Sequence, residues 1–283
     1  MPGILYLVAT PIGNLEDITF RAVRILREEV QLIACEDTRQ TQKLLEHYNI
    51  RKPLVSYHEH NEAARVIEIL ETLERGDSVA IVSDAGTPLV SDPGYRVVQA
   101  AIGRGLSVVP IPGPSAALAA LAGSGLPTDE FLFIGFLPQK ETARRTKLTE
   151  IAGYPGVVIA YESPHRIMET LAEASEILEG RSLVLARELT KLYEEFVRGT
   201  AADIRAHLIK NQPARGEMTL VIGKSELREP DLDAAAEIAR LQQEGVPRMD
   251  AIKAVAKRMG LPKREVYRRA EGRGNNPAGK HRD

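Results

Sequence analysis

The stretch VAIVSDAGTPLVSDPGY at residues 79–95 determines how the first half of this chain folds. Its first four residues are an apolar run of the kind that forms a buried strand, and a helical pattern begins at its last residue. The residues between them, 83–94, hold two glycines, two prolines and two aspartates. These residues form fixed turns and let the backbone approach a bound molecule. We therefore expect a long ligand-binding loop at the carboxyl end of a strand in an α/β sheet.

Strands and helices alternate regularly on either side of this stretch. Apolar runs predict strands at 4–9, 32–35, 54–57, 79–82 and 107–111. Helical patterns separate them at 18–29, 41–48, 63–73 and 95–102. Single helices between strands predict right-handed crossovers, and hence a largely parallel sheet that is covered on both faces.

The pattern changes after residue 115. A short helix at 116–122 ends in the sequence GSGLP, and a second α/β region follows it, with strands at 131–136, 157–161, 183–186 and 219–222 and helices at 142–152 and 166–178. One more helix contains Arg205, Leu208 and Ile209, and three others cover 234–244, 249–259 and 263–271. We expect α/β domains at 1–124 and 125–226, a basic helical domain at 227–272 and a disordered tail at 273–283.

The composition excludes several classes of protein. With 43% apolar residues, 27% charged residues and a net charge of −2, the chain is typical of a soluble globular protein. Its single cysteine, Cys35, excludes an internal disulfide and a cysteine-rich zinc site, and no pattern of histidines predicts a metal. We see neither a membrane-spanning run nor a signal peptide, so we expect a cytoplasmic protein.

The charge is distributed unevenly along the chain. Residues 245–283 hold eleven Lys and Arg against four Asp and Glu, a net charge of +7, while residues 1–244 carry −9. A basic segment of this kind binds a polyanion, or it is simply the solvated face of a helix. The charge by itself leaves both interpretations open.

Polar or turn-rich loops follow several predicted strands. They have the sequences TPIGN (10–14), CEDTR (35–39), the loop at 83–94, PGPSA (112–116), YESPHR (161–166) and RELTK (187–191). Loops of this composition at one edge of two sheets predict a cleft between two domains. The dinucleotide motif GxGxxG, the phosphate loop GxxxxGK[ST] and the GxSxG nucleophile motif do not occur at these positions.

Taken together, the motifs VATPIGNLED (8–17), EDTR (36–39), SDAGTP (83–88), PGPSA (112–116), YESPHR (161–166) and ARELTK (186–191) resemble the ribosomal RNA small-subunit methyltransferase I family. That family lies within the tetrapyrrole methylase superfamily, and the resemblance covers essentially the whole chain. It implies 2′-O-methylation of a cytidine in the decoding region of 16S rRNA. It also implies two α/β domains with S-adenosylmethionine in the cleft between them, and a homodimer.

The resemblance also assigns residues to the cofactor site. It implies contacts from both α/β domains, made by Pro11, Ile12, Gly13, Asp84, Thr87, Ser115, Ala116, Tyr161, Ala186, Gly216 and Met218. One departure within the superfamily concerns the first loop. Corphin and porphyrin methylases have a glycine-rich sequence there, whereas this chain has TPIGN. The departure argues against a tetrapyrrole substrate.

Methyl transfer to a hydroxyl needs alignment and removal of a proton. We predict Asp37 as the base, with Glu36 and Glu162 as further candidates. Each of these carboxylates has an alternative role, as a helix N-cap or as an ion-pair partner of Arg39 or Arg166.

Contacts to the RNA are expected from two places in the chain. At the cleft we expect Glu36, Arg39, Arg166, Arg187 and Lys191, the last two at the phosphates that flank the target. In the basic region, a helix–turn–helix-like arrangement presents Lys263, Arg264, Arg268 and Arg269.

Two other functions remain open at this point. One is methylation of a small molecule such as a corrin precursor, for which the basic tail has no purpose. The other is a DNA-binding regulator that senses S-adenosylmethionine without catalysis. The EDTR and YESPHR loops favour the rRNA methyltransferase over the regulator.

Overall fold

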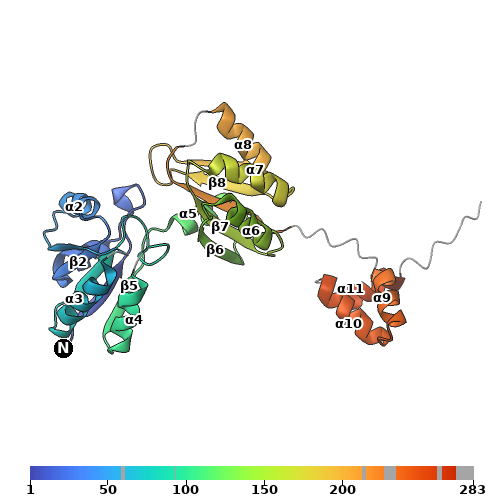
Figure 1. The fold of residues 1–283 in the computed structure, drawn as a ribbon, viewed down its shortest axis with the longest axis horizontal. Coiled ribbons are helices and arrows are strands. Elements are labelled where there is room, and N and C mark those ends of the chain that lie inside the picture. The colour runs from blue at the N-terminus through green and yellow to red at the C-terminus, as the bar shows by residue number, and fades with distance from the viewer. Residues whose placement is uncertain (59–60, 93, 212–214, 226–233, 260–262, 272–283) are drawn as a thin grey trace, which may run out of the picture. The chain divides into compact units, whose positions relative to one another are not determined.

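The structure is a computed structural model that describes residues 1–58, 61–92, 94–211, 215–225, 234–259 and 263–271, without the side chains of Lys257, Arg258, Met259, Arg269 and Glu271. The chain divides into two compact units, Met1–Ser225 and Glu226–Asp283 (Figure 1). No helix in the described part is long and apolar enough to cross a membrane. The predicted tail at 273–283 lies outside the described residues.

The first unit begins with a five-stranded parallel sheet. Its strands are β1 (Ile4–Val8), β2 (Leu32–Cys35), β3 (Leu54–Ser56), β4 (Val79–Val82) and β5 (Ser107–Ile111), arranged in the order β3-β2-β4-β1-β5. Every adjacent pair is parallel. The carboxyl ends of all five strands therefore lie at one edge of the sheet, as predicted from the alternation of strands and helices.

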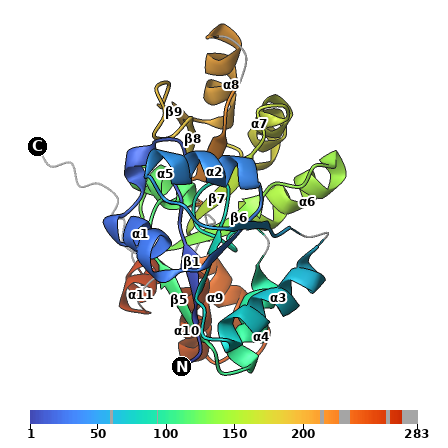
Figure 2. The same ribbon diagram turned by 90° about the vertical axis from the view of Figure 1, so that its left-hand side faces the viewer.

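Helices cover both faces of this sheet (Figure 2). The helices α1 (Phe20–Arg24) and α2 (Thr38–His47) pack on one face, where Tyr6 and Val8 of β1 are buried. On the other face α3 (Glu62–Glu74) and α4 (Tyr95–Gly103) pack on Leu5. Neighbouring residues of a strand thus enter opposite cores, which explains why each strand reads as an unbroken apolar run.

Two helices differ from their predicted bounds for local reasons. The helix predicted at 18–29 is divided into α1 and a π-helical turn (Ile25–Glu29) that the Val30 N–H closes on the Ile25 carbonyl, and a separate 3₁₀ turn (Leu15–Asp17) precedes it. Helix α2 begins at Thr38, three residues earlier than predicted, because the Asp37 carboxylate caps it by accepting a hydrogen bond from the Arg39 N–H.

The second sheet, also in the first unit, is mixed. It contains β6 (Phe131–Phe136), β7 (Val157–Glu162), β8 (Leu183–Arg187), β9 (Glu195–Gly199) and β10 (Met218–Ile222), in the order β6-β7-β10-β8-β9. Strand β10 is antiparallel to both β7 and β8. Its amino end therefore lies at the same edge as their carboxyl ends. Strand β9 was not predicted, since only Phe196 and Val197 of EFVRG are apolar and the strand lies at the edge of the sheet.

Unequal layers cover the two faces of this sheet. The helices α6 (Glu141–Ala152), α7 (Ile167–Ile177) and α8 (Ala201–Lys210) pack on one face. The single helix α5 (Ala116–Ser124) packs on the other, against Val157, Ile159 and Val221. The predicted boundary at 124/125 thus falls at the end of a helix that belongs to the core of the second sheet. The finer domain limits stay predictions.

The described residues of the second unit form three helices, α9 (Ala234–Gln243), α10 (Arg248–Met259) and α11 (Lys263–Glu271). Apolar side chains from all three form its core, among them Ile238, Ile252 and Val266. Because Val266 is fully buried while Lys263, Arg264 and Arg268 are exposed, α11 presents a basic face to solvent. The predicted turn at 260–262 lies outside the described residues.

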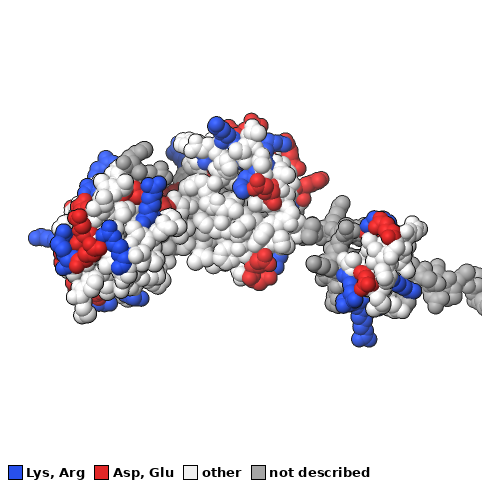
Figure 3. Space-filling view, turned by 60° about the horizontal axis from the view of Figure 1, so that its bottom comes forward, with Lys and Arg blue, Asp and Glu red and all other residues white. Residues whose placement is uncertain are grey.

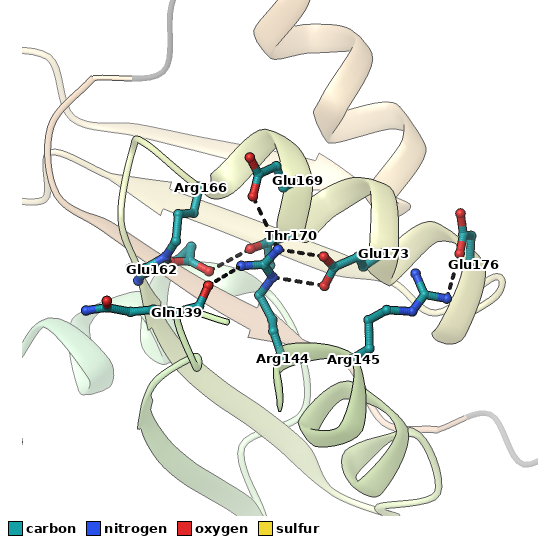
Figure 4. Close-up of polar contacts among 9 residues, drawn as sticks. All are labelled: Gln139, Arg144, Arg145, Glu162, Arg166, Glu169, Thr170, Glu173 and Glu176. Atoms are coloured by element: carbon teal, nitrogen blue, oxygen red, sulfur yellow. Dashed lines mark hydrogen bonds and ion pairs between the residues drawn. The ribbon is translucent and has the colours of Figure 1, made fainter. Parts of the chain in front are cut away.

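An arginine is buried between α6 and α7 (Figure 4). The Arg144 guanidinium donates to both carboxylate oxygens of Glu173, at 2.9 and 2.6 Å, and to the Gln139 carbonyl at 3.2 Å. The side chains of Arg144 and Glu173 are 1% and 8% exposed. The adjacent Arg145 pairs with Glu176 at 2.9 Å, where both side chains are exposed.

These two neighbouring pairs predict very different effects of substitution. Arg144→Ala leaves a carboxylate buried without its partner and is expected to lower the free energy of unfolding by about 3–5 kcal/mol. Arg145→Ala is the matched control and is expected to change it by about 1 kcal/mol or less, because water screens an exposed pair. Chemical denaturation of both variants measures the difference, and equal decreases would contradict the assignment of Arg144 as a buried anchor.

Candidate active site

A pocket of about 510 Å³ lies where loops of both sheets of the first unit meet. The first sheet contributes the loops after β1, β4 and β5, and the second sheet contributes the ends of β6 and β7, the loop after β8 and the start of β10. The lining residues are Ile12, Asp84, Ala85, Gly86, Thr87, Val90, Ser91, Asp92, Ser115, Ala116, Phe136, Tyr161, Glu162, Ser163, Pro164, Lys191, Gly216, Glu217, Met218 and Thr219.

Hydrogen bonds fix the loops of the first sheet to one another. Thr10 and Gly86 exchange both backbone N–H···O bonds, at 2.8 and 3.0 Å, which joins the first loop to the long one. The Thr10 hydroxyl donates to the Ser83 carbonyl at 3.0 Å. At the third loop, the Thr87 hydroxyl donates to the Pro114 carbonyl, and Ser115 caps α5. The pocket wall on this side is therefore held by bonds to the backbone.

Charged side chains fix the loop after β7. Glu162 is buried, and its Oε1 accepts hydrogen bonds from the Ser163 N–H and the Arg166 guanidinium, while its Oε2 accepts one from the Thr170 hydroxyl at 2.6 Å (Figure 4). Because the Glu162 carboxylate accepts all of these hydrogen bonds, it holds the backbone at Ser163 and Pro164 in place, and both of these residues line the pocket.

A second charged cluster closes the loop after β8. The Lys191 ammonium donates to Glu188 at 2.9 Å and to Glu217 at 3.1 Å. Burial disfavours the charged form of Lys191, but the hydrogen bonds to the two carboxylates outweigh it, so the pKa of Lys191 is raised. The Glu188 carboxylate also accepts from the Glu217 N–H, which joins this loop to the start of β10.

The loop after β1 lies directly against the loop after β8. The Asn14 N–H donates to the Thr190 hydroxyl at 3.1 Å. A Cβ on Gly13 would lie 2.5 Å from Cγ of Lys191, so only glycine leaves room for the lysine stem. Ile12 is buried in the apolar cluster beneath the second sheet. The two sheets are thus joined across one side of the pocket.

Acidic groups on the long loop give the pocket its electrostatic character. Burial, aided by the neighbouring carboxylates of Glu36 and Asp84, raises the pKa of Asp92 to about 6, although a hydrogen bond from Ser83 opposes the shift. A carboxyl group with such a pKa is poised to accept a proton near neutral pH. Asp92 was not singled out from the sequence, although the signal was present in the repeated aspartates of the loop.

Most residues predicted for the cofactor site lie around the pocket. Those that line it are Ile12, Asp84, Thr87, Ser115, Ala116, Tyr161, Gly216 and Met218. Pro11, Gly13 and Ala186 are not among the lining residues. Gly13 faces Lys191 instead, and Ala186 is buried in the core beneath α5. The structure adds Phe136, which packs edge-to-face on Tyr161 with ring centroids 5.4 Å apart.

The residues predicted for catalysis and RNA binding are mostly held in ion pairs. Asp37 caps α2 and pairs with Arg39, and its hydrogen bonds with Arg39 lower the pKa of its carboxyl to about 2. Glu36 lies close enough to Asp92 to raise the pKa of that residue. Arg187 pairs with Glu195 at 2.8 Å. The alternative roles of Asp37 and Glu162, as a cap and as an ion-pair partner, are therefore those seen in the structure.

Comparison with known proteins identifies the class of protein to which this fold belongs. A family model described as Tetrapyrrole (Corrin/Porphyrin) Methylases matches residues 4–205. Cobalt precorrin-4 methyltransferase superposes with a TM-score of 0.58 at 17% identity, over 78% of this chain and 94% of that structure. Diphthine synthase does so with a TM-score of 0.59 at 15% identity, over 78% and 90%. The fold is that of a tetrapyrrole methylase.

Curated relatives narrow this class. Ribosomal RNA small subunit methyltransferase I of Halalkalibacterium halodurans is 48% identical over 272 residues, covering 94% of this chain and 93% of the relative. The protein of that name from Bacillus subtilis is 45% identical over 273 residues, with 94% and 93% covered. This chain belongs to the ribosomal RNA small subunit methyltransferase I family.

The crowding at Gly216 yields a prediction about the pocket. Gly216 has a φ of +82°, and a Cβ there would lie 2.1 Å from Oε1 of Glu188. Gly216→Ala is therefore expected to displace the Glu188–Lys191–Glu217 cluster and to lower the free energy of unfolding by about 2 kcal/mol or more.

Gly103→Ala is the matched control for this variant. Gly103 ends α4, and nothing lies within 4 Å of a Cβ built on it, so alanine is expected to be neutral or slightly stabilising. Thermal unfolding distinguishes the two variants. A Gly216→Ala protein as stable as Gly103→Ala would show that the crowding does not constrain the loop.

Proposed function

We propose that this protein transfers a methyl group from S-adenosylmethionine to the 2′-hydroxyl of a cytidine in the decoding region of 16S rRNA. Membership of the family and the names of the curated relatives support an rRNA methyltransferase. The observation that carries the proposal is the acidic pocket between the two sheets. We also propose that the enzyme acts in the cytoplasm, where its substrate is made.

The pocket suits the methyl donor in size and in charge. Its volume of about 510 Å³ falls within the range of small-molecule sites. Among the described residues that line it, the carboxylates of Asp84, Asp92, Glu162 and Glu217 outnumber the one lysine, Lys191, and this excess of carboxylates complements a cationic sulfonium. Ile12 and Met218 supply apolar surface, and backbone at Gly86 and Gly216 allows close approach. S-adenosylmethionine supplies an activated methyl group, so the chain's own task is to align the hydroxyl and remove its proton.

Asp92 is the group best placed for that proton transfer. It lines the pocket, and its pKa of about 6 leaves it ionised yet basic at neutral pH. Asp37 was the predicted base, and that assignment stays a prediction. Its carboxyl, with a pKa of about 2 and both oxygens bonded to Arg39, is a weak proton acceptor.

The assignment of the base predicts a pH profile. The carboxylate form of Asp92 is the active one, so kcat/KM is expected to rise about tenfold per pH unit below pH 6 and to level off above it. Asp92→Asn is expected to lower kcat by about 10²–10⁴-fold and to leave the affinity for S-adenosylmethionine similar. Asp37→Asn serves as the comparison. If it alone abolishes turnover and retains cofactor binding, Asp37 is the base.

We further propose that the helical second unit grips the RNA through Lys263, Arg264, Arg268 and Arg269. The first three are exposed along α11, and the side chain of Arg269 lies outside the described residues. Binding to phosphates releases counterions and makes the affinity fall with salt.

This proposal predicts a measurable salt slope. Lys263→Gln combined with Arg264→Gln is expected to flatten the dependence of log K on log salt by about 0.7–0.9 for each phosphate that the protein no longer neutralises. Arg240→Gln on α9, where Arg240 already pairs with Glu237 and Glu244, is the control and is expected to keep the wild-type slope. Filter binding of 30S subunits over a salt series measures it. Equal slopes in all three proteins would remove α11 from the RNA interface.

A homodimer is proposed as well, on the basis of the second sheet. The part of the first unit that contains the second sheet presents a broad surface without charged side chains (Figure 3). Strand β6 lies at the edge of that sheet, and Phe131 and Leu132 on it are 42% and 37% exposed. An unprotected apolar edge strand is a typical site of self-association.

The direct test of function is label transfer from methyl-labelled S-adenosylmethionine to 30S subunits and, separately, to naked 16S rRNA. The expected product is an alkali-resistant 2′-O-methylcytidine in one or both substrates. Tight cofactor binding without label in either RNA would contradict the proposal and favour a small-molecule methylase or a cofactor-sensing regulator.

A further inference from the structure

We propose that the tip of the β8–β9 loop, Leu192 and Tyr193, is a stacking platform for an unpaired base next to the methylated nucleotide. The inference rests on the proposed rRNA substrate and extends it to a specific interaction. It starts from an unusual exposure. Leu192 and Tyr193 are 88% and 74% exposed, although both are large and apolar.

The loop that carries this tip is tightly constrained. The Glu188 N–H donates to the Glu217 carbonyl, the Lys191 N–H to the Glu188 carbonyl, and the Glu194 N–H to the Lys191 carbonyl, at 3.0, 3.0 and 3.1 Å. The Thr190 N–H donates to the Glu194 carboxylate at 2.6 Å. Glu188 and Thr190 both adopt positive φ values, 49° and 65°. Such backbone strain persists only where the surroundings enforce one conformation.

The base of the loop is anchored in the protein on two sides. Leu189 is buried in the apolar cluster beneath the second sheet. The Thr190 hydroxyl accepts a hydrogen bond from the Asn14 N–H of the first loop. The two apolar side chains at the tip of this strained, anchored loop are exposed to solvent, so they do not stabilise the fold by burial. We therefore assign the tip to binding.

The position of the tip identifies the kind of partner. Lys191, directly before Leu192, lines the pocket, so the tip lies at the pocket rim. We infer that the nucleotide beside the one whose 2′-hydroxyl enters the pocket is unpaired, because unpaired bases bind proteins by stacking on aromatic side chains. A tyrosine side chain on a constrained loop has few rotatable bonds, so it loses little conformational entropy in such stacking.

A cation on the same rim fits the adjoining phosphate. Arg215 is exposed and forms no ion pair with a described residue. It precedes Gly216, and a Cβ built on Gly216 would lie 2.1 Å from Oε1 of Glu188, which belongs to the loop that carries Tyr193. Stacking on Tyr193 and charge from Arg215 together form the pattern by which proteins hold single-stranded nucleic acid.

The chain contains no tryptophan, which makes a direct test possible. In Tyr193→Trp the new indole is the sole tryptophan, and a base stacked on it is expected to quench its fluorescence. The probes are a short single-stranded RNA of mixed sequence and the same strand annealed to its complement. We expect strong quenching by the single strand and little by the duplex.

Ile102→Trp is the matched control. Ile102 is 62% exposed near the carboxyl end of α4, which places it at the edge of the first sheet opposite the pocket. Its indole is expected to be unaffected by either RNA. Equal responses at both positions, or quenching at neither, would overturn the stacking assignment.

A kinetic test separates binding from folding. Tyr193→Ala is expected to raise KM for 30S subunits by about tenfold or more and to leave kcat and the affinity for S-adenosylmethionine near wild type. Tyr193→Phe keeps the ring and is expected to restore KM. Arg215→Gln is expected to raise KM and to reduce its salt dependence.

The outcomes also distinguish this inference from the proposed function. A wild-type protein that labels 30S subunits while Tyr193→Ala keeps its KM would refute the platform alone. If Tyr193→Ala instead changes the mass in light scattering and leaves KM unchanged, the tip is a self-association surface, and the inference is wrong. Failure of the wild-type protein to label RNA would refute the proposed function, and the quenching experiment would still report on stacking.

Discussion

The insertion of Ile12 into the apolar cluster beneath the second sheet holds the two halves of the first unit together. It carries the loop after β1 across to the second sheet, where Asn14 bonds to Thr190 and Gly13 makes room for Lys191. The same loop is bonded through Thr10 to the long loop after β4. One short segment thus connects both walls of the pocket, so the spacing of the walls is fixed by backbone and packing rather than by flexible side chains.

Strain and charge are concentrated around that pocket. Leu89 and Ser91 on one wall and Glu188 and Thr190 on the other all have positive φ values, although none is glycine. Strained residues of this kind persist where packing and hydrogen bonds over-determine them, and they cluster at functional sites. The pKa of Asp92 is raised in the same wall, because its carboxyl group is buried near the carboxylates of Glu36 and Asp84. The buried Glu162 carboxylate, which pairs with Arg166 and accepts from the Ser163 N–H, supports the pocket wall on the side of the second sheet.

The sequence predicted the parallel sheet, the order of elements and most of the pocket, because these follow from local signals. Unbroken apolar runs mark strands buried on both faces, and loops rich in Gly, Pro and Asp mark the carboxyl edge. What it missed depends on tertiary interactions. Strand β9 is polar enough to read as a loop, and it is a strand because it pairs with β8. The cap of α2 is a local interaction, in which the Asp37 carboxylate takes the N-cap role that the sequence offered as the alternative to a base. Asp92 differs from Asp37 in two ways, because Asp92 is buried near Glu36 and Asp84 whereas Asp37 is bonded to Arg39, and the sequence does not display the burial.

If loops of both sheets hold S-adenosylmethionine in one pocket, binding of the cofactor must alter all of those loops together. Hydrogen–deuterium exchange with and without S-adenosylmethionine examines this point loop by loop, because each loop yields its own peptides. We expect simultaneous protection of the segments around Ile12, Asp84, Ser115, Tyr161 and Gly216, with the end of α4 at Gly103 unchanged. Protection confined to one sheet, or found only in the helical second unit, would contradict a shared pocket.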